Sequence, residues 1–153
     1  MAKILLDPSK MTEITGFGGN IDKDALNPAI NIAQNTHLKR ILGVDLYDKM
    51  LEGNPTGVYL TIRNDYVNYI LSFYSASIYL SLFSIKTTNN GSYKLSGGDG
   101  DAQVTHADLN LLSKNYEQVA LSYEKNFIEF MNTQDVTEYP KNTKTVSRLI
   151  NLY

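Results

Sequence analysis

The hydrophobic and polar positions of this chain predict a mainly helical protein built around one uncharged stretch. Residues 66–85 (YVNYILSFYSASIYLSLFSI) contain no charged side chain. As a helix, the stretch would be about 30 Å long and apolar or small on nearly every side. Such a helix must be hidden from water by its own chain, by neighbouring copies or by lipid. Which of these covers it decides the class of protein.

A long helix is predicted before this stretch. Its N-cap is Asp24 or Asn27, because Pro28 fits only the first turn of a helix. Gly43 is the expected C-cap. The inward face at helical spacing comprises Leu26, Ile30, Ala33, His37 and Ile41. A shorter helix follows, with Asp45 as its expected N-cap and Gly53 and Pro55 at its end, and with Tyr47, Met50 and Leu51 facing inward.

A second long helix is predicted after the stretch. Thr105 is its expected N-cap, with Asp108 in the position of a capping box. The helix is expected to fade at residues 132–133, before the break at Tyr139-Pro140. Its inward apolar stripe is predicted to comprise Leu109, Leu112, Tyr116, Val119, Tyr123, Phe127 and Phe130.

The remaining segments predict a hairpin, a loop and two arms. Two short β-prone runs flank Asn90-Gly91, a pair suited to a type I′ turn. The expected fold class is a helical bundle with a projecting β-hairpin and extended N- and C-terminal arms. We expect one domain over 1–153, divided into an N-terminal arm (1–21), helices (22–84), hairpin and loop (85–101), a long helix (104–133) and a C-terminal tail (134–153).

The composition excludes several classes of function. The net charge is −2, and without a Lys/Arg cluster the chain has no surface suited to coating nucleic acid. The chain contains no cysteine, which excludes disulfides and thiolate metal sites. Asp7, Pro8 and Lys10 interrupt the N-terminus before a signal-peptide core can form, so a cytosolic site of synthesis and assembly is expected.

The candidate catalytic and ligand-binding residues favour structural roles. His37 lies on the inward helix face and is expected to be a buried, hydrogen-bonded histidine, while His106 is expected to be exposed. The loop Gly97–Asp101 lacks the spaced ligands of a calcium loop. HExxH, GxSxG and phosphate-loop motifs are absent. We therefore expect no enzyme activity, no metal and no cofactor.

The uncharged stretch also permits a membrane alternative. Its length meets the requirement for spanning a bilayer, so a single-pass lysis or envelope factor that uses residues 66–85 is the competing hypothesis. Five serines, Asn68 and four tyrosines argue against it, since Tyr74 would lie at mid-depth rather than at an interface. The small residues Ser75, Ala76 and Ser77 instead favour a central helix ringed by other helices.

The run from Gly19 to Leu51 resembles the opening of a family of small tailed-bacteriophage proteins. The matching features are Gly19-Asn20-Ile21-Asp22, Leu26, Pro28, Ile30, Ala33-Gln34, Leu42-Gly43 and Leu46-Tyr47. In the C-terminal half, Ala120, Tyr123, Phe127 and the Tyr139-Pro140 break are similar too. The family comprises head–tail connectors, also called adaptor or ring proteins, and the likeness over residues 12–141 is nearest to those of crAss-like phages that infect Bacteroidetes.

This resemblance implies a structural virion protein. It implies a homo-oligomeric ring, expected to be a dodecamer, that lies in the neck between the portal and the next neck or tail ring protein. Such a ring would extend the DNA channel for genome ejection and let double-stranded DNA pass without sequence-specific binding. The expected location is the virion, after assembly in the host cytoplasm, with no membrane partner.

Contact between subunits is expected at segments that do not pack in their own domain. Leu121 and Ile128 lie away from the predicted stripe, so they are either chance surface residues or half of a contact with another copy. The hairpin, the loop and both tails are the other candidates. The predicted interface residues are Asn90, Gly91, Tyr93, Asp99, Asp101, Leu121, Ile128, Leu149, Ile150 and Tyr153.

Overall fold

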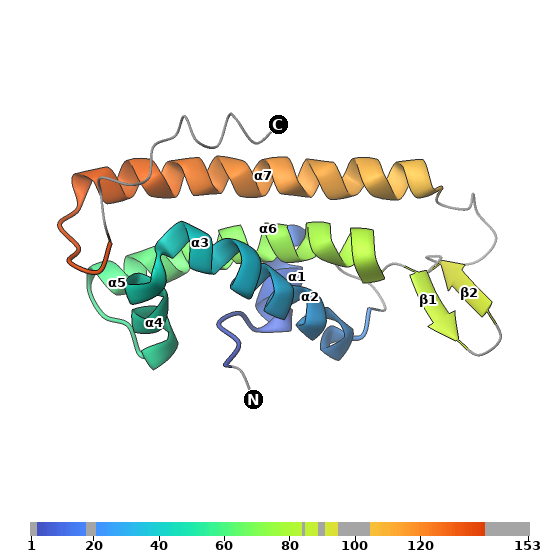
Figure 1. Ribbon diagram of the computed structural model, residues 1–153, viewed down its shortest axis with the longest axis horizontal. Coiled ribbons are helices and arrows are strands. Elements are labelled where there is room, and N and C mark those ends of the chain that lie inside the picture. Colours follow the sequence, from blue (N-terminus) through green and yellow to red (C-terminus); the bar gives the residue numbers. More distant parts are fainter. Residues whose placement is uncertain (1–2, 18–20, 84, 89–90, 95–104, 140–153) are drawn as a thin grey trace.

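Two long helical segments lie side by side and organise the fold. The computed structural model describes residues 3–17, 21–83, 85–88, 91–94 and 105–139. The first segment joins α5 (Val58–Thr61), η3 (Ile62–Val67), α6 (Asn68–Ile78) and η4 (Tyr79–Phe83) without a break. The second is α7 (His106–Thr133). They are packed along the long axis of the molecule, as Figure 1 shows.

The predicted helix before the uncharged stretch is confirmed. It begins with η1 (Lys23–Leu26) and continues through α2 (Asn27–Ala33), the π-helical turn η2 (Gln34–Leu38) and α3 (Lys39–Leu42). Its N-cap is Asp22, whose side chain accepts a hydrogen bond from Asp24 N, so the helix starts earlier than expected. It ends at Gly43 with φ +79°, a conformation that favours glycine. The next helix, α4 (Val44–Glu52), ends in the same way at Gly53, but its N-cap is Gly43 and the expected cap Asp45 lies in its first turn.

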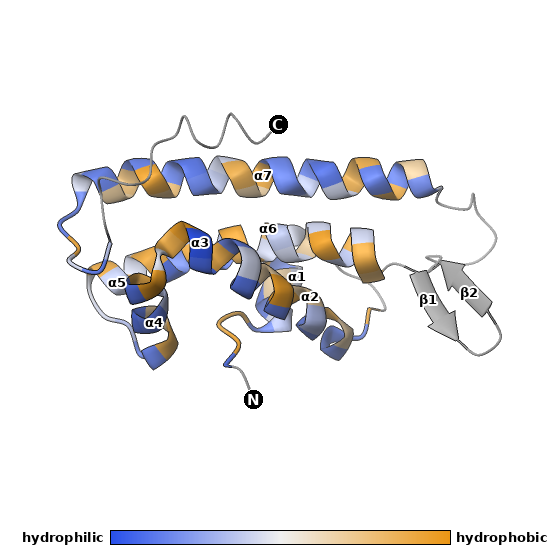
Figure 2. Cartoon of the chain, viewed as in Figure 1, coloured by the Kyte–Doolittle hydropathy of each residue, from blue (hydrophilic) through white to orange (hydrophobic). Residues whose placement is uncertain are grey.

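Most of the α6 segment of the uncharged stretch is covered by its own chain, whereas Leu82 near the end of the stretch is exposed. Helices α1 (Pro8–Thr15), α2 and α7 all pack against α6. Figure 2 shows α6 between α7 and the helices α1 and α2. The buried residues of α6 are Ile70, Leu71, Ser72, Tyr74, Ser75, Ala76 and Ser77. Within the described residues, none of the helices has the length and apolarity that a membrane span requires.

The expected fold class is wrong as a description of the packed domain. The packed part of the described chain consists of helices, and a β-hairpin is not part of its architecture. The short strands β1 (Ile85–Thr88) and β2 (Gly91–Lys94) pair antiparallel with each other in a sheet of their own. Their register pairs Thr88 with Gly91, so Gly91 belongs to β2 rather than to the predicted turn.

The expected extended N-terminal arm is also wrong. Residues Pro8–Thr15 form α1, because Asp7 caps the first turn, Pro8 suits that position and Gly16 ends the helix with φ +66°. Burial of apolar side chains fixes the segment to the domain: Leu5, Leu6, Met11 and Phe17 are all buried. The C-terminal tail beyond Tyr139 lies outside the described residues.

The start of α7 is as predicted, but its inward face is rotated from the predicted stripe. Thr105 and Asp108 form the capping box, with the Thr105 hydroxyl accepting from Asp108 N. Leu112 and Val119 are exposed, whereas Ile128 is buried. The buried residues of α7 are Ser113, Ala120, Glu124, Phe127, Ile128 and Met131. The stripe prediction is wrong because the buried face of α7 includes polar residues, among them Glu124, and is not purely apolar.

Candidate interaction surfaces

A buried carboxylate joins three helices on one side of the α6–α7 pair. Glu124 of α7 is 1% exposed, and its two oxygens lie 2.8 Å and 3.3 Å from the guanidinium nitrogens of Arg40 on α3. The Tyr74 hydroxyl of α6 donates to the same carboxylate at 2.8 Å. Because a buried charge is tolerated only when it is paired and hydrogen-bonded, this triad fixes the relative positions of the three helices.

The electrostatics of the triad extend to the neighbouring histidine. Burial tends to lower the pKa of Arg40, but the hydrogen bond and negative charge of Glu124 raise this pKa above its ordinary value. Burial lowers the pKa of His37, and the positive charge of Arg40 lowers it further. The uncharged form of His37 is therefore favoured in the folded protein.

His37 contacts an aromatic ring rather than a hydrogen-bond partner at Nδ1. Its imidazole stacks on Tyr74 with ring centroids 3.9 Å apart and planes at 5°. Among the described residues, the buried Nδ1 has no hydrogen-bond partner. The predicted inward position is confirmed, burial is only partial, and Nδ1 does not supply the hydrogen bond that was expected of this histidine. Sequence periodicity places the residue on a face but does not specify its contacts.

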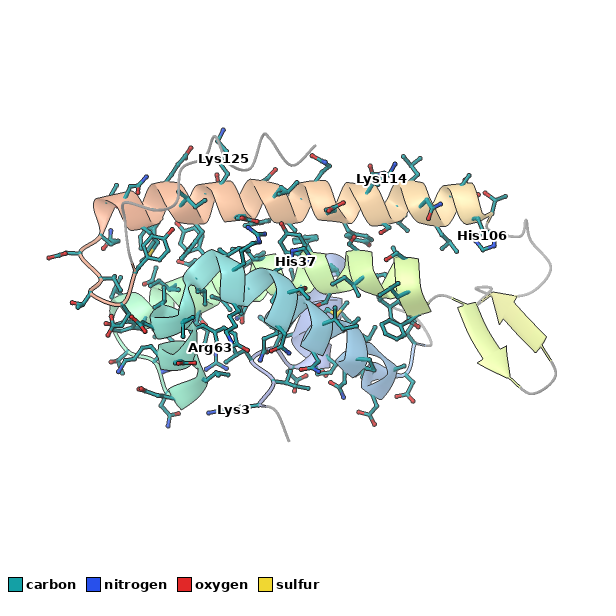
Figure 3. All side chains as sticks on the ribbon, in the orientation of Figure 1. Lys3, His37, Arg63, His106, Lys114 and Lys125 are labelled. Carbon is teal, nitrogen blue, oxygen red and sulfur yellow. The ribbon has the colours of Figure 1, made fainter. Side chains whose placement is uncertain are left out.

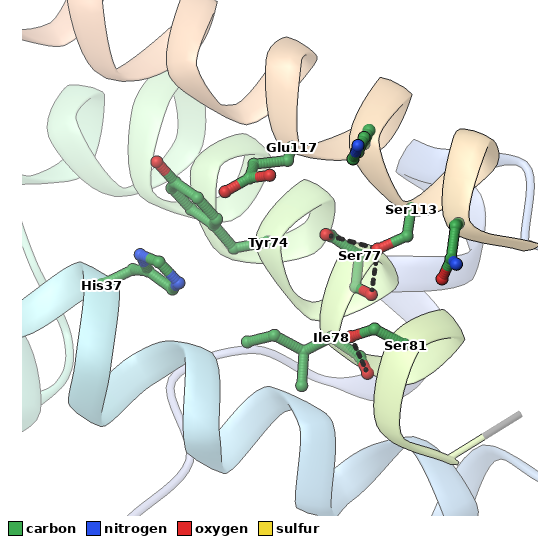
Figure 4. Close-up of a pocket in the computed structure, with 9 residues that line it drawn as sticks. His37, Tyr74, Ser77, Ile78, Ser81, Ser113 and Glu117 are labelled. Atoms are coloured by element: carbon green, nitrogen blue, oxygen red, sulfur yellow. Dashed lines mark hydrogen bonds between the residues drawn. The ribbon is translucent and has the colours of Figure 1, made fainter. Parts of the chain in front are cut away.

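A groove of about 390 Å³ opens beside this stack. Figure 4 shows its walls, which come from His37 in η2, from the α6 segment and from α7. The Ser77 and Ser113 hydroxyls lie 3.0 Å apart, and Ser113 Oγ also donates to the Ser77 carbonyl at 2.9 Å. These small side chains let α6 and α7 approach closely. The other lining residues are Tyr74, Ile78, Ser81, Asn110, Lys114 and Glu117.

Aromatic side chains form a continuous row on another side of the α6–α7 pair. Tyr66 stacks on Phe130 and Tyr69 on Tyr123, each with ring centroids 4.9 Å apart. Phe73 lies 5.7 Å from Tyr123 and 6.1 Å from Tyr116. We call this row the aromatic seam and define it as Tyr66, Tyr69, Phe73, Leu112, Tyr116, Val119, Tyr123 and Phe130. Its aromatic rings are only partly buried, and Leu112 and Val119 are 42% and 37% exposed.

Large apolar side chains are also exposed at both ends of the molecule. Leu82 and Leu111 are 63% and 61% exposed near the N-terminal end of α7. Val44 and Leu60 are 58% and 44% exposed in α4 and α5, at the opposite end in Figure 1. The outer face of α7 is more polar, and Figure 3 shows Lys125 pointing away from α6. The exposed apolar residues at one end belong to η4 and α7, and those at the other end belong to α4 and α5.

The structure describes only some of the predicted interface residues. Gly91 and Tyr93 lie in β2 and pair with Thr88 and Lys86. Leu121 is partly buried, and Ile128 is 3% exposed, so its assignment to the surface of the subunit is wrong. The predicted residues outside the described ranges are Asn90, Asp99, Asp101, Leu149, Ile150 and Tyr153.

Sequence reasoning predicted the α7 residues of the seam as an inward stripe but missed their partners on the α6 side and the buried ion pair. The seam had a signal, because Tyr66, Tyr69 and Phe73 recur at spacings of three and four within the uncharged stretch. The ion pair had a weaker signal, namely Glu124 between Ala120 and Phe127 on the inward side of α7. Its partner Arg40 is 84 positions away, so pairing depends on the tertiary fold.

Comparison with known proteins shows a family match over most of the chain. Neither the curated proteins nor the solved structures include a match to this chain. Residues 38–148, well over half of the chain, match DUF6712, a family of unknown function. The matched region contains α6, α7 and the ion pair between Arg40 and Glu124. The chain therefore belongs to the DUF6712 family.

Proposed function

We propose that this protein is a head–tail connector of a tailed bacteriophage, a structural subunit that forms a ring between the portal and the tail. The resemblance of residues 19–51 to connector proteins supplies the biological context. The physical support is an uncharged central helix that packs inside a small helical domain, combined with apolar side chains left exposed at both of its ends. The domain therefore has surfaces available for assembly.

The observation that carries the proposal is the difference between the two ends. A closed ring needs a heterologous contact, in which one surface of a subunit meets a different surface of the next. Leu82 and Leu111 form one candidate surface, and Val44 and Leu60 form the other. Burial of such side chains between subunits would contribute roughly 25 cal/mol per Å² of apolar surface before the costs of association.

The ring would bind the portal on one face and the next neck or tail protein on the other. Double-stranded DNA would pass through its channel without sequence-specific contact. The net charge of −2 fits this role, because a strongly basic channel would hold the phosphate backbone. If the loop that contains Asp99 and Asp101 lines the channel, charge reversal at both positions should slow DNA passage. Normal ejection kinetics would contradict this placement of the loop.

The heterologous contact can be tested with two complementary variants. Leu82→Glu disables one end, and Leu60→Glu disables the other. Neither variant alone should form rings, either in isolation or on the cognate portal. In a mixture, each variant retains the surface that the other lacks, so native mass spectrometry should detect a one-to-one dimer that cannot grow. A mixture that forms full rings, or wild-type protein that stays monomeric on the portal, would contradict the proposal.

A matched substitution controls for loss of folding. Lys125→Glu changes an exposed position on the outer face of α7, away from both ends. This variant should assemble like the wild type. Circular dichroism of all three variants should show the same helical content, because the substituted side chains are exposed.

A further inference from the structure

The groove beside the stack of His37 and Tyr74 has the size and the mixed lining of a small-molecule site. Its volume of about 390 Å³ falls within the range of about 300–1,000 Å³ that is usual for ligand pockets. Tyr74 and Ile78 of α6 supply apolar surface, while Lys114 and Glu117 of α7 supply charged groups (Figure 4). An apolar wall with a few polar groups is the usual composition of a site for a small ligand.

Two irregular helical turns meet at this groove. His37 belongs to the π-helical turn η2, and Ser81 belongs to the π-helical turn η4. Single turns of this kind inside longer helices occur frequently at functional sites. The coincidence of two such turns at one groove favours a binding role.

The imidazole of His37 contributes polar atoms to the groove but no formal charge. Its Nδ1 has no hydrogen-bond partner within the part of the chain that the structure describes. Polar atoms left unpaired in this way are few in native proteins, and some of them have a functional role. Burial and the positive charge of Arg40 lower the pKa of His37, so the neutral form is favoured.

The charged residues that line the groove are one cation and one anion. Lys114 and Glu117 lie three positions apart on α7, so they share one side of the helix and are separated by about 4.5 Å along its axis. A ligand with a single charge would face a like charge from one of these two residues. A ligand that carries both signs can place each charge beside its opposite.

We propose that this groove binds a small zwitterion, with the ammonium group of the ligand at Glu117 and its carboxylate at Lys114. The apolar part of the ligand contacts Tyr74 and Ile78, and the amide of Asn110 is available to either charged group. A free amino acid with an apolar side chain is the simplest ligand of this class. The proposal does not depend on the role in a phage neck.

The two histidines of the chain provide a reporter and an internal control. Norleucine is added to the full-length protein while the NMR signals of both imidazoles are followed. The His37 signals should shift with a dissociation constant in the millimolar range, because the ligand is small. His106 is exposed and does not line the groove, so its signals should stay unchanged. Unchanged His37 signals, or equal shifts at both histidines, would overturn the proposal.

Two further probes separate the charges of the ligand. Pentylamine lacks the carboxylate of norleucine, and hexanoate lacks its ammonium group, while both keep the hydrocarbon chain. Each should bind at least about tenfold more weakly than norleucine, because one hydrogen bond between charged groups is lost. Equal affinity for all three probes would overturn the assignment of a zwitterion.

Variants of the two charged residues identify which end of the ligand each one holds. Glu117→Gln and Lys114→Met should each weaken the binding of norleucine about tenfold. Glu117→Gln should bind hexanoate no more weakly than the wild type, and Lys114→Met should do the same for pentylamine. Wild-type affinity for norleucine in both variants would contradict the proposed contacts.

A matched charge removal and a blocking substitution complete the test. Lys125→Met removes an exposed lysine from the outer face of α7 and should leave the affinity for norleucine unchanged. Ser81 is exposed and lines the groove, so Ser81→Phe should fill the groove and abolish binding without loss of helical content in circular dichroism. Binding that survives Ser81→Phe would place the ligand elsewhere and overturn the proposal.

Discussion

Arg40 and Glu124 form an ion pair between α3 and α7, with Arg40 Nη1 2.8 Å from Glu124 Oε1. The two side chains differ sharply in exposure, because the Arg40 side chain is 44% exposed while that of Glu124 is 2% exposed. Removal of Arg40 and removal of Glu124 should therefore lower the free energy of unfolding by different amounts. Removal of the arginine leaves a buried anion, whereas removal of the acid leaves a cation that can still reach water.

Arg40→Met should destabilise the protein by about 3 kcal/mol, because Glu124 keeps only the hydrogen bond from Tyr74. Glu124→Gln should cost about 1–2 kcal/mol, since the amide oxygen can still accept that bond. Urea unfolding followed by circular dichroism measures both differences. Equal costs for the two variants would contradict the asymmetry that the burial of Glu124 implies.

An exposed ion pair provides the control for this experiment. Lys10 and Glu13 lie 3.4 Å apart on α1, and both side chains are solvent-accessible. Lys10→Met should change the free energy of unfolding by less than about 1 kcal/mol. A cost as large as that of Arg40→Met would show that removal of any such charge destabilises the fold.

Close approach of α6 and α7 depends on the small residues Ser77 and Ser113, whose hydroxyls lie 3.0 Å apart. Ser113→Leu should destabilise the protein by about 1–3 kcal/mol, because the larger side chain forces the helices apart. Ser122→Leu is the matched change at an exposed position of α7 and should be nearly neutral. Thermal unfolding compares the two variants, and equal melting temperatures would argue against close packing at Ser113.

The aromatic seam and the core should respond differently to truncation of an aromatic side chain. Phe127 is fully buried, so Phe127→Ala should cost about 3–5 kcal/mol through lost burial and cavity formation. Phe130 is only partly buried, and Phe130→Ala should cost less. Denaturant unfolding of both variants checks the order. A larger cost at Phe130 would contradict its partial burial.

His37 should make the folded protein less stable at mildly acidic pH. Burial holds the pKa of folded His37 below its ordinary 6.5, so above this pH the residue is neutral in both states. As the pH falls below 6.5, the unfolded chain binds the proton more readily, and stability decreases until folded His37 also protonates. His37→Phe keeps a ring beside Tyr74 and should reduce this pH dependence between neutral pH and about pH 5. An unchanged pH profile in urea unfolding would contradict the assignment.

Local sequence signals predicted where the helices lie in the chain better than they predicted which face of each helix is buried. Gly43, Gly53 and the Thr105–Asp108 capping box act within one turn of the chain, so they could be identified without tertiary information. The prediction of an N-terminal arm is wrong because Asp7 and Pro8, which interrupt the apolar start of the chain, also form a helix N-terminus. Burial of Met11 against the core decides for the helix.

The interaction surfaces were less accessible to sequence reasoning. Ile128 was assigned to the surface because the apolar stripe of α7 was drawn through Leu112 and Val119. The true inward face includes Ser113 and Glu124, which are buried only because Ser77, Arg40 and Tyr74 meet them across other helices. Such partners are distant in the chain, so periodicity alone does not reveal them.

The oligomeric state on the cognate portal tests the central proposal most directly. Detergent-free full-length protein should be mixed with portal and measured by native mass spectrometry and electron microscopy. The account predicts a closed ring of this chain stacked coaxially on the portal, and loss of that ring in the Leu82→Glu and Leu60→Glu variants. Wild-type protein that leaves the portal unoccupied at high concentration would contradict a role as a connector.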